Sequence, residues 1–288
     1  HAATIIRLGT HISTAGGAYR SFQRAHDAGC DSFLIFTKSN RQWAVTALTD
    51  DDIAAYASAV TEHANICPVS VHAAYLINVA SPDPALWERS YEALKDEVER
   101  AAALGIELVT FHPGSYMGSS EAEGLAAIAR ALRRLLAETA ETAPNTVICL
   151  ETMAGQGSVL GGDISEFSAI LDHVEGHPRI GFWVGICRVF ASGYEMRTHE
   201  SYNRLVDLLD KHVGIERIHC WHLSDSKMER GSKKDRHQHL GEGTIGLEPF
   251  SMLVNDARFE NIPAILETPK EGMGDEGNIS VLRKLRGE

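Results

Sequence analysis

Residues 88–114, ERSYEALKDEVERAAALGIELVTFHPG, contain the helix-then-strand unit whose repetition decides the fold. In the first part apolar residues return at helical spacing, and Gly105 stands where a helix of that period would end. The second part, ELVTFHPG (107–114), is a short apolar run closed by Pro and Gly, which is typical of a buried strand. The next segment, EAEGLAAIARALRRLLAETA (121–140), again carries an apolar stripe at helical spacing.

The same alternation extends over the whole chain, with no linker, low-complexity tract or charge block to divide it. This pattern predicts repeated βα units and a parallel sheet. The strand candidates are TIIRLGTHIS (4–13), DSFLIFT (31–37), VSVHAAY (69–75), ELVTFHPG (107–114), TVICLET (146–152), RIGFWVGI (179–186), ERIHCWHLSD (216–225) and PAILETP (263–269). We therefore expect an α/β protein: a single (β/α)8 TIM-barrel domain, residues 1–288, with its active site at the C-terminal ends of the strands.

Composition and charge limit the possible functions. The chain has 288 residues, of which 44% are hydrophobic and 23% charged, as in an ordinary soluble enzyme. Its net charge of -12 counts against a protein that holds nucleic acid mainly through a basic surface. Bound divalent cations would offset several carboxylates, so the overall charge does not decide the partner.

The cysteines and the N-terminal sequence bear on location. The 5 cysteines are odd in number, widely spread and without a Cys-x-x-Cys pair, which argues against a disulfide framework or a zinc knuckle. No cationic start precedes an apolar core, and no apolar run approaches the ~20 residues that span a bilayer. We expect a cytoplasmic protein with no membrane association, and take a monomer as the working hypothesis.

Metal-competent side chains stand at or near the carboxyl ends of five strand candidates, where a barrel of this kind assembles its active site. They are His72, His112, Glu151, His222 and Glu267. Any one alone fits a loop hydrogen bonder or a helix cap, whereas five at the same level favour a metal site. Imidazole and carboxylate suit zinc or manganese, and paired metals activate water against a phosphodiester.

The segment KDRHQHLGEGTIG (234–246) adds further side chains of the ligand type. It contains Asp235, His237 and His239, with glycines just after, and its Asp-x-His pattern places two residues of the ligand type on one side of an extended stretch. A polar surface turn is the alternative reading of this segment.

At these residues the sequence resembles endonuclease IV, the family of zinc-dependent enzymes that cleave DNA at abasic sites. The resemblance covers nearly the whole chain. The segments that carry it are GTHISTAGG (9–17), FTKSNRQW (36–43), HAAYLINVASP (72–82), FHPGS (111–115), LETMAGQGS (150–158), FASGYEMRT (190–198), HLSDSK (222–227), DRHQHLGEGTIG (235–246) and ILETP (265–269).

The resemblance implies a repair enzyme with three zinc ions at the barrel mouth and a hydroxide that attacks the phosphate 5′ to the lesion, leaving a 3′ hydroxyl. The implied ligands of the first ion are His72, His112 and Glu151, and those of the second are Glu151, His222 and Glu267. The third ion would be held by Asp235 and His237. Glu151 and Glu267 are the implied catalytic residues. The implied partner is double-stranded DNA that contains an abasic site.

The resemblance also suggests residues that contact DNA. Arg41 and Gln42 would enter the helix at the lesion, with Tyr75 beside them, because an inserted side chain replaces lost base stacking. For Trp43 we expect packing of its loop onto the barrel. Phosphate contacts or solvated surface are the two readings of Lys38, Arg41, Lys227, Lys233, Lys234 and Arg236.

The sixth strand departs from the family pattern, in which Asp-x-x-His supplies two ligands. Gly185 stands in place of the aspartate and Arg188 in place of the histidine. Glycine has no donor atom and arginine is permanently cationic, so we expect no third zinc and a total of two ions, zinc or manganese. Arg188 would pair in a bidentate manner with Asp235 or hold a substrate phosphate.

The leading hypothesis is a metal-dependent abasic-site endonuclease, a phosphoric diester hydrolase of base excision repair, whose level of activity the two lost ligands leave open. One alternative is a catalytically impaired protein that binds abasic DNA. The other is a metal-dependent sugar isomerase or epimerase, since related barrels place His and Glu at strand ends for proton or hydride shifts.

Overall fold

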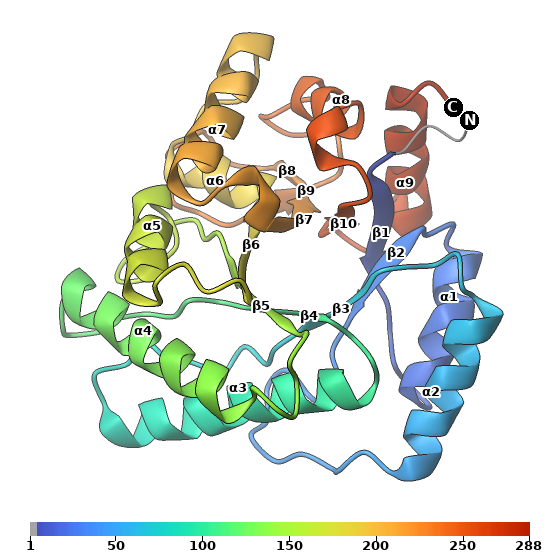
Figure 1. The fold of residues 1–288 in the computed structure, drawn as a ribbon. Coiled ribbons are helices and arrows are strands. Elements are labelled where there is room, and N and C mark those ends of the chain that lie inside the picture. The colour runs from blue at the N-terminus through green and yellow to red at the C-terminus, as the bar shows by residue number, and fades with distance from the viewer. Residues whose placement is uncertain (1–4) are drawn as a thin grey trace.

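In the computed structural model, eight parallel strands close into a barrel with helices around the outside (Figure 1). The structure describes residues 5–288, so Thr4 of the first expected strand lies outside the described residues. The order around the barrel is β1-β10-β7-β6-β5-β4-β3-β2. The strands are β1 (Arg7–His11), β2 (Ser32–Ile35), β3 (Val69–His72), β4 (Leu108–Phe111), β5 (Val147–Glu151), β6 (Ile180–Gly185), β7 (Ile218–Leu223) and β10 (Pro263–Leu266). The expected (β/α)8 barrel is confirmed; that residues 1–288 form one domain stays a prediction.

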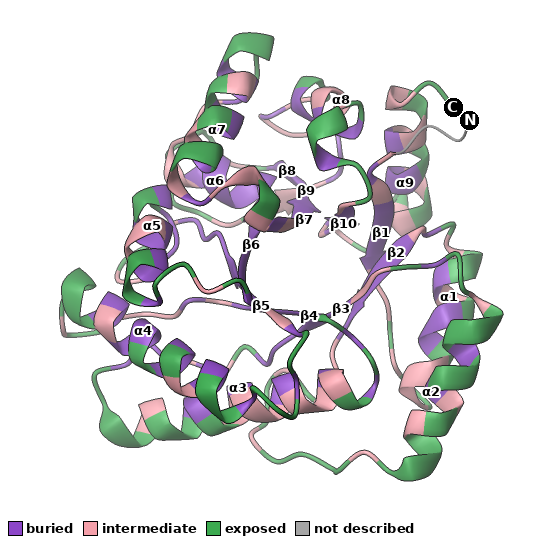
Figure 2. Ribbon diagram, in the orientation of Figure 1, coloured by how far each residue is buried: buried purple, intermediate pink, exposed green. Residues whose placement is uncertain are grey.

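Helices cover the barrel and turn their buried faces toward it (Figure 2). The α-helices are α1 (Ser21–Asp27), α2 (Asp50–Glu62), α3 (Pro84–Ala103), α4 (Glu121–Glu138), α5 (Ile164–His173), α6 (Ile186–Ser192), α7 (His199–His212), α8 (Glu248–Val254) and α9 (Gly274–Leu285). Short 3-10 helices are η1 (Ala18–Arg20), η2 (Ile215–Arg217) and η3 (Ala257–Phe259). Among residues 5–288, no helix combines the length and apolar character that crossing a bilayer requires.

Local signals explain the bounds of α3. The helix begins at Pro84 rather than at Glu88, because the Asp83 carboxylate accepts a hydrogen bond from the backbone N–H of Ala85 and proline suits the first helical position. It ends at Ala103, and Gly105 follows with a φ of +77°, the left-handed conformation that closes many helices.

The inside of the barrel is filled beneath its mouth. The inward-facing residues there are Leu34, Leu108, Cys149, Trp183, Cys220 and Ile265, all buried in one cluster. The ring of Trp183 lies edge-on to His222, with 5.2 Å between ring centroids. The floor of the mouth is therefore apolar and packed, and side chains above it are held away from bulk water.

A small antiparallel sheet follows β7, which the sequence did not predict. The stretch expected to be a single strand to residue 225 ends at Leu223, and β8 (Asp225–Ser226) then pairs with β9 (His237–Gln238). This pairing brings the segment after residue 234 back over the barrel.

Glu97 of α3 supports the loops at the mouth from below. Its carboxylate is about 1% exposed, accepts the backbone N–H of Ala74 at 2.8 Å and lies 3.3 Å from Thr37 Oγ1. Burial raises the pKa of Glu97 to about 7, although Lys38, 4.0 Å away, partly offsets it.

We expect Glu97→Gln to remove a pH dependence of stability. Between pH 4.5, the ordinary pKa, and about 7, the folded protein keeps a proton that the unfolded chain releases. The wild type therefore loses about 3 kcal/mol from this group as the pH rises through that window. Urea unfolding at pH 4.5 and at about pH 7 measures this. The free energy of unfolding of the variant should rise relative to that of the wild type as the pH increases. Glu92→Gln, at an exposed position on the same helix, is the control, and a pH-independent difference for Glu97→Gln would contradict the expectation.

Candidate metal centre

The barrel brings together the five strand-end residues singled out in the sequence. His72 and Glu151 end β3 and β5, His112 and Glu267 follow β4 and β10, and His222 lies in β7. The Glu151 carboxylate is at the centre: His112 Nε2 lies 3.1 Å from Oε1, and His222 Nδ1 lies 3.1 Å from Oε2. His222 Nδ1 also lies 2.5 Å from Glu267 Oε1. Parallel strands of one barrel end at the same level, so residues distant in sequence converge.

His72, His112 and Glu151 have the geometry of a ligand set. Their donor atoms all lie within 4.8 Å of one another. The carbonyl oxygen of Ala73 accepts a hydrogen bond from His72 Nδ1 at 2.7 Å, which leaves Nε2 free to coordinate. Burial lowers the pKa of His112 more than Glu151 raises it, so the ring stays neutral, as a metal ligand must be. The donors present therefore fit one divalent ion.

Asp235 and His237 lie on the other side of the mouth. Asp235 Oδ1 is 2.6 Å from His237 Nε2, and His237 Nδ1 is 2.6 Å from the carbonyl oxygen of Glu267. With Cys187 they form a second group of ligand-type atoms within 4.8 Å. His239, the third residue of the ligand type in this segment, lies apart from the other two: it is buried and bonds to Asn278, because the chain turns after β9.

Arg188 occupies the space between these groups. It comes from the first turn of α6, is 7% exposed and reaches three carboxylates, Glu151, Asp235 and Glu267, which we call the mouth carboxylates. Nη1 lies 2.7 Å from Glu151 Oε1 and 2.8 Å from Glu267 Oε1, and Nη2 lies 2.9 Å from Glu267 Oε2. Nε lies 3.1 Å from Asp235 Oδ2.

These contacts correct the sequence-based expectation for Arg188. A contact with Asp235 is present, but it is single; the bidentate partner is Glu267, whose two oxygens face the two terminal nitrogens. The four contacts use four of the five N–H donors of a guanidinium, so one remains for a substrate phosphate.

The electrostatics keep the mouth carboxylates ionised. Burial opposes ionisation of Glu151 and Glu267, but Arg188, followed by His222, outweighs it and holds the pKa of both carboxyls well below the usual range. The charges outweigh burial at His222 as well. Burial lowers the pKa of His222, but Glu267 and Glu151 raise it by more, to about 9.

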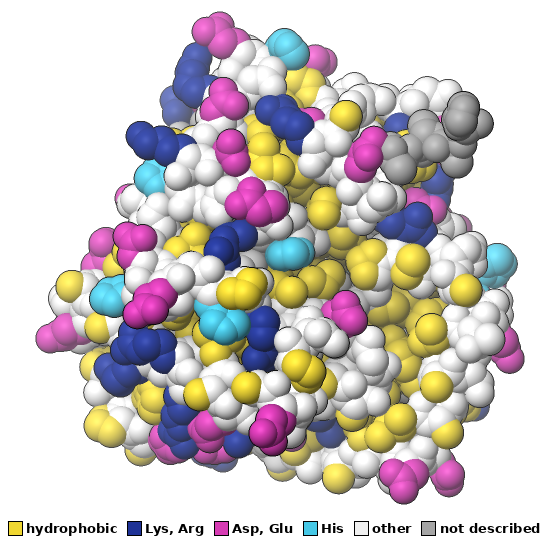
Figure 3. Space-filling view, in the orientation of Figure 1, with side chains coloured by type: hydrophobic (Ala, Val, Ile, Leu, Met, Phe, Trp, Pro, Cys, Tyr) yellow, Lys and Arg dark blue, Asp and Glu magenta, His cyan; other side chains and the backbone are white. Residues whose placement is uncertain are grey.

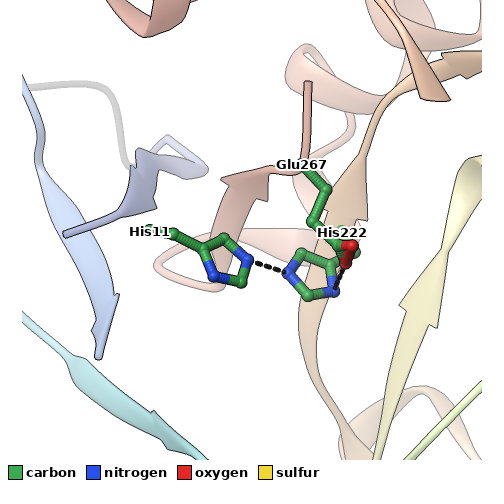
Figure 4. A group of neighbouring side chains, drawn as sticks. All are labelled: His11, His222 and Glu267. Atoms are coloured by element: carbon green, nitrogen blue, oxygen red, sulfur yellow. Dashed lines mark hydrogen bonds and ion pairs between the residues drawn. The ribbon is translucent and has the colours of Figure 1, made fainter. Parts of the chain in front are cut away.

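Two residues of this site were missed in the sequence. His11 ends β1 and its ring stacks on His222, with Nε2 atoms 3.0 Å apart (Figure 4). Asp225 of β8 is fully buried and accepts backbone N–H groups of Gly241, Ile245 and Gly246, which folds the glycine-rich segment against the barrel. The strand-end position of His11 was a usable signal; for Asp225 the signal was a carboxylate after β7 ahead of several glycines.

The residues expected to contact DNA lie beside the site. The Tyr75 ring stacks on His112, 5.4 Å between centroids, and is 47% exposed. The Tyr75 N–H donates to Asn40 O at 2.9 Å, which ties the loop of Arg41 and Gln42 to the mouth, and both of these side chains are exposed. Trp43 packs onto α3, as expected, with the Cζ atom of Arg89 4.6 Å from the centroid of the Trp43 ring.

The basic residues proposed for phosphate contacts separate into two groups. Lys38 was wrongly included, because its amine is buried and pairs with Asp96 at 3.1 Å. The others are exposed: Arg41, Lys227, Lys233, Lys234 and Arg236. On the face shown in Figure 3, acidic and basic side chains are interspersed.

Comparisons with known proteins agree with this geometry. Residues 22–285 match the family of xylose isomerase-like TIM barrels. A protein of Chloroflexus aurantiacus named probable endonuclease 4 is 43% identical over 281 residues, covering 97% of this chain and 98% of its own. A probable endonuclease 4 of Geobacter sulfurreducens is 38% identical, covering 97% and 93%. The crystal structure of endonuclease IV from Thermus thermophilus superposes with a TM-score of 0.86 at 31% identity, covering 98% and 99%.

A further resemblance concerns the fold alone. A D-tagatose 3-epimerase-like protein superposes with a TM-score of 0.72 at 19% identity, covering 98% of this chain and 97% of that one.

We expect His112→Ala to reduce uptake of a divalent ion by at least about 100-fold. Loss of a residue that merely supports a ligand typically costs about 10–100-fold in affinity, and His112 supplies a donor atom itself. Competition titrations with Zn²⁺ or Mn²⁺ measure this. His219→Ala is the matched control, because His219 lies on β7 with His222 but faces the opposite side of the strand. Equal affinities in both variants would exclude His112 as a ligand.

Proposed function

Because this chain belongs to the endonuclease IV family of xylose isomerase-like TIM barrels, we propose that it is a DNA repair endonuclease that hydrolyses the phosphodiester 5′ to an abasic site in duplex DNA. The observation that carries the proposal is the ligand set of His72, His112 and Glu151 with Tyr75 stacked at its edge, in a chain similar to endonuclease 4 over nearly its whole length.

The proposed cofactor is zinc, with manganese as the alternative that His and carboxylate donors also accept. His72, His112 and Glu151 would hold it. A bound ion of this kind lowers the pKa of water and polarises a phosphate oxygen. The positions on the Asp235 and Glu267 side do not fit a metal in the same way. Arg188 bonds both oxygens of Glu267 and Oδ2 of Asp235, whereas at Glu151 it bonds Oε1 alone and leaves Oε2 clear.

Glu151 and Glu267 are the proposed catalytic residues. Both carboxyls are ionised at neutral pH, since Arg188 and His222 hold their pKa values low against the effect of burial. Glu267 is partly open to the mouth, with its side chain 16% exposed, and would accept a hydrogen bond from an attacking water and so orient it. His222, whose pKa is raised to about 9, would donate a hydrogen bond to either carboxylate.

Double-stranded DNA with an abasic site is the proposed partner. Arg41 and Gln42 project from the loop beside the mouth and would enter the helix at the lesion, while Tyr75 would stack on an exposed base or sugar. The monomeric state and the cytoplasmic location stay predictions.

A specific observation favours one alternative, a protein that binds abasic DNA without cutting it. Arg188 fills positions at which the family carries metal, while the proposed DNA-contacting residues Arg41, Gln42 and Tyr75 are all in place. The sugar epimerase alternative has the fold alone as support.

We expect zinc-dependent cleavage of a duplex carrying one abasic analogue, 5′ to the lesion, giving a 3′ hydroxyl end that a polymerase extends. Glu151→Gln should abolish cleavage, because it removes a ligand charge from the centre of the site, while His219→Ala should leave it unchanged. Denaturing gels of an end-labelled duplex measure both. Tight binding of the lesion without cleavage would overturn the endonuclease proposal in favour of the binding protein; neither binding nor cleavage would overturn both.

We expect Tyr75→Ala to weaken binding to the abasic duplex by about 5- to 150-fold, the usual effect of losing one aromatic stacking surface of about 1–3 kcal/mol. Tyr75→Phe keeps the ring and should bind as the wild type does. Fluorescence anisotropy measures affinity, and the zinc content of each variant checks that His112 beneath the ring still coordinates. Unchanged affinity of Tyr75→Ala with unchanged zinc would remove Tyr75 from the interface.

A further inference from the structure

The guanidinium of Arg188 lies where the mouth carboxylates converge. All three are within 3.1 Å of one of its nitrogens, and the bidentate contact with Glu267 is the charge-assisted geometry that arginine forms best. Arginine cannot lose its proton in a protein, so this positive charge is permanent.

We infer that Arg188 is a built-in cation that takes the place of metal between Glu267 and Asp235, so that the barrel mouth binds one divalent ion, at His72, His112 and Glu151. The inference deepens the proposed function and rests on it for the choice of zinc. It differs from the two ions expected from the sequence alone.

The charges at the mouth support a capacity of one ion. With the guanidinium counted, the three carboxylates leave at most two negative units of net charge, which a single divalent ion balances. A second ion near Glu267 would lie in contact with the guanidinium, and like charges repel strongly where water is largely excluded.

The other two groups of ligand-type atoms are both committed to Arg188. Glu267 of the His11, His222 and Glu267 group already accepts Nη1 and Nη2, and Asp235 of the Cys187, Asp235 and His237 group accepts Nε. In the first of these groups, His11 and His222 also share a hydrogen bond between their Nε2 atoms (Figure 4). An ion at either place would have to break these contacts.

His72 and His112, by contrast, make no contact with Arg188 among the hydrogen bonds and ion pairs of the described residues. Glu151 uses Oε1 for Arg188 and His112, while Oε2 faces His72 at 3.7 Å and His222 at 3.1 Å. The first ligand set therefore keeps donor atoms that the guanidinium does not occupy.

Two substitutions reopen the filled positions. Arg188→His removes the permanent charge and places an imidazole beside Asp235 and His237. Gly185→Asp adds a carboxylate toward the same space, because a Cβ on Gly185 would meet Arg188 Nη1 at 3.5 Å, an ordinary contact.

The test is zinc per folded chain, measured by mass spectrometry after equilibration with zinc and removal of the free ion. We expect one ion in the wild type, about two in Arg188→His and about three in Gly185→Asp/Arg188→His. Arg134→His is the matched control: Arg134 also pairs with three carboxylates, Glu88, Glu92 and Glu138, but on the surface between α3 and α4, and should leave the count at one.

Two or three ions in the wild type would overturn the inference, as would an unchanged count in a folded Arg188→His. If Arg188→His fails to fold, a competition titration of the wild type with zinc decides the inference, and we expect it to show one tight site. Cleavage of an abasic duplex, measured in parallel, separates the two proposals. If the wild type, Arg188→His and Gly185→Asp/Arg188→His bind one, two and three zinc ions but none of them cleaves, the endonuclease proposal is contradicted and the inference about Arg188 stands. Cleavage by a wild type with three ions contradicts only the inference.

Discussion

The contacts of Arg188 with Glu151 and Glu267 hold the centre of this molecule together. The Glu151 carboxylate is completely buried on an apolar floor, and a buried carboxylate needs a cation close by if it is to stay ionised. The guanidinium meets that need within the chain itself, and His222, whose pKa is raised to about 9, contacts the same two carboxylates. The arrangement of the charged side chains at the mouth therefore depends on these contacts.

The barrel supplies the positions for that balance through its backbone geometry. Inward and outward side chains alternate along each strand, so His222 faces the mouth while His219 of the same strand faces the helices. The loops that complete the site are held from outside the barrel: Glu97 of α3 fixes the backbone at Ala74, and Asp225 gathers the amides of the glycine-rich segment. The candidate metal centre is thus built on barrel strands and closed by loops that buried carboxylates hold in place.

The relation to endonuclease 4 is broad, whereas the departure from it is local. Similarity extends over 97% of the chain, yet the end of β6 and the first turn of α6 carry a glycine and an arginine at the most charged point of the site. Gly185 borders the Arg188 side chain, since a Cβ there would lie 3.5 Å from Nη1, and Arg188 crosses the mouth from this point to Glu267. A shared fold therefore does not by itself decide the chemistry at its strand ends, which depends on the side chains placed there.

The sequence by itself determined the barrel, the order of its eight strands, and the convergence of His72, His112, Glu151, His222 and Glu267. Local periodicity and the position of a residue at a strand end are properties of short stretches of chain. Only the tertiary structure decided that Arg188 binds Glu267 through both terminal nitrogens, that Lys38 is buried against Asp96 and that His239 turns away from Asp235. Arg188 lies 37, 47 and 79 residues from its three partners, and the choice among them depends on distances across the barrel mouth that no local pattern encodes.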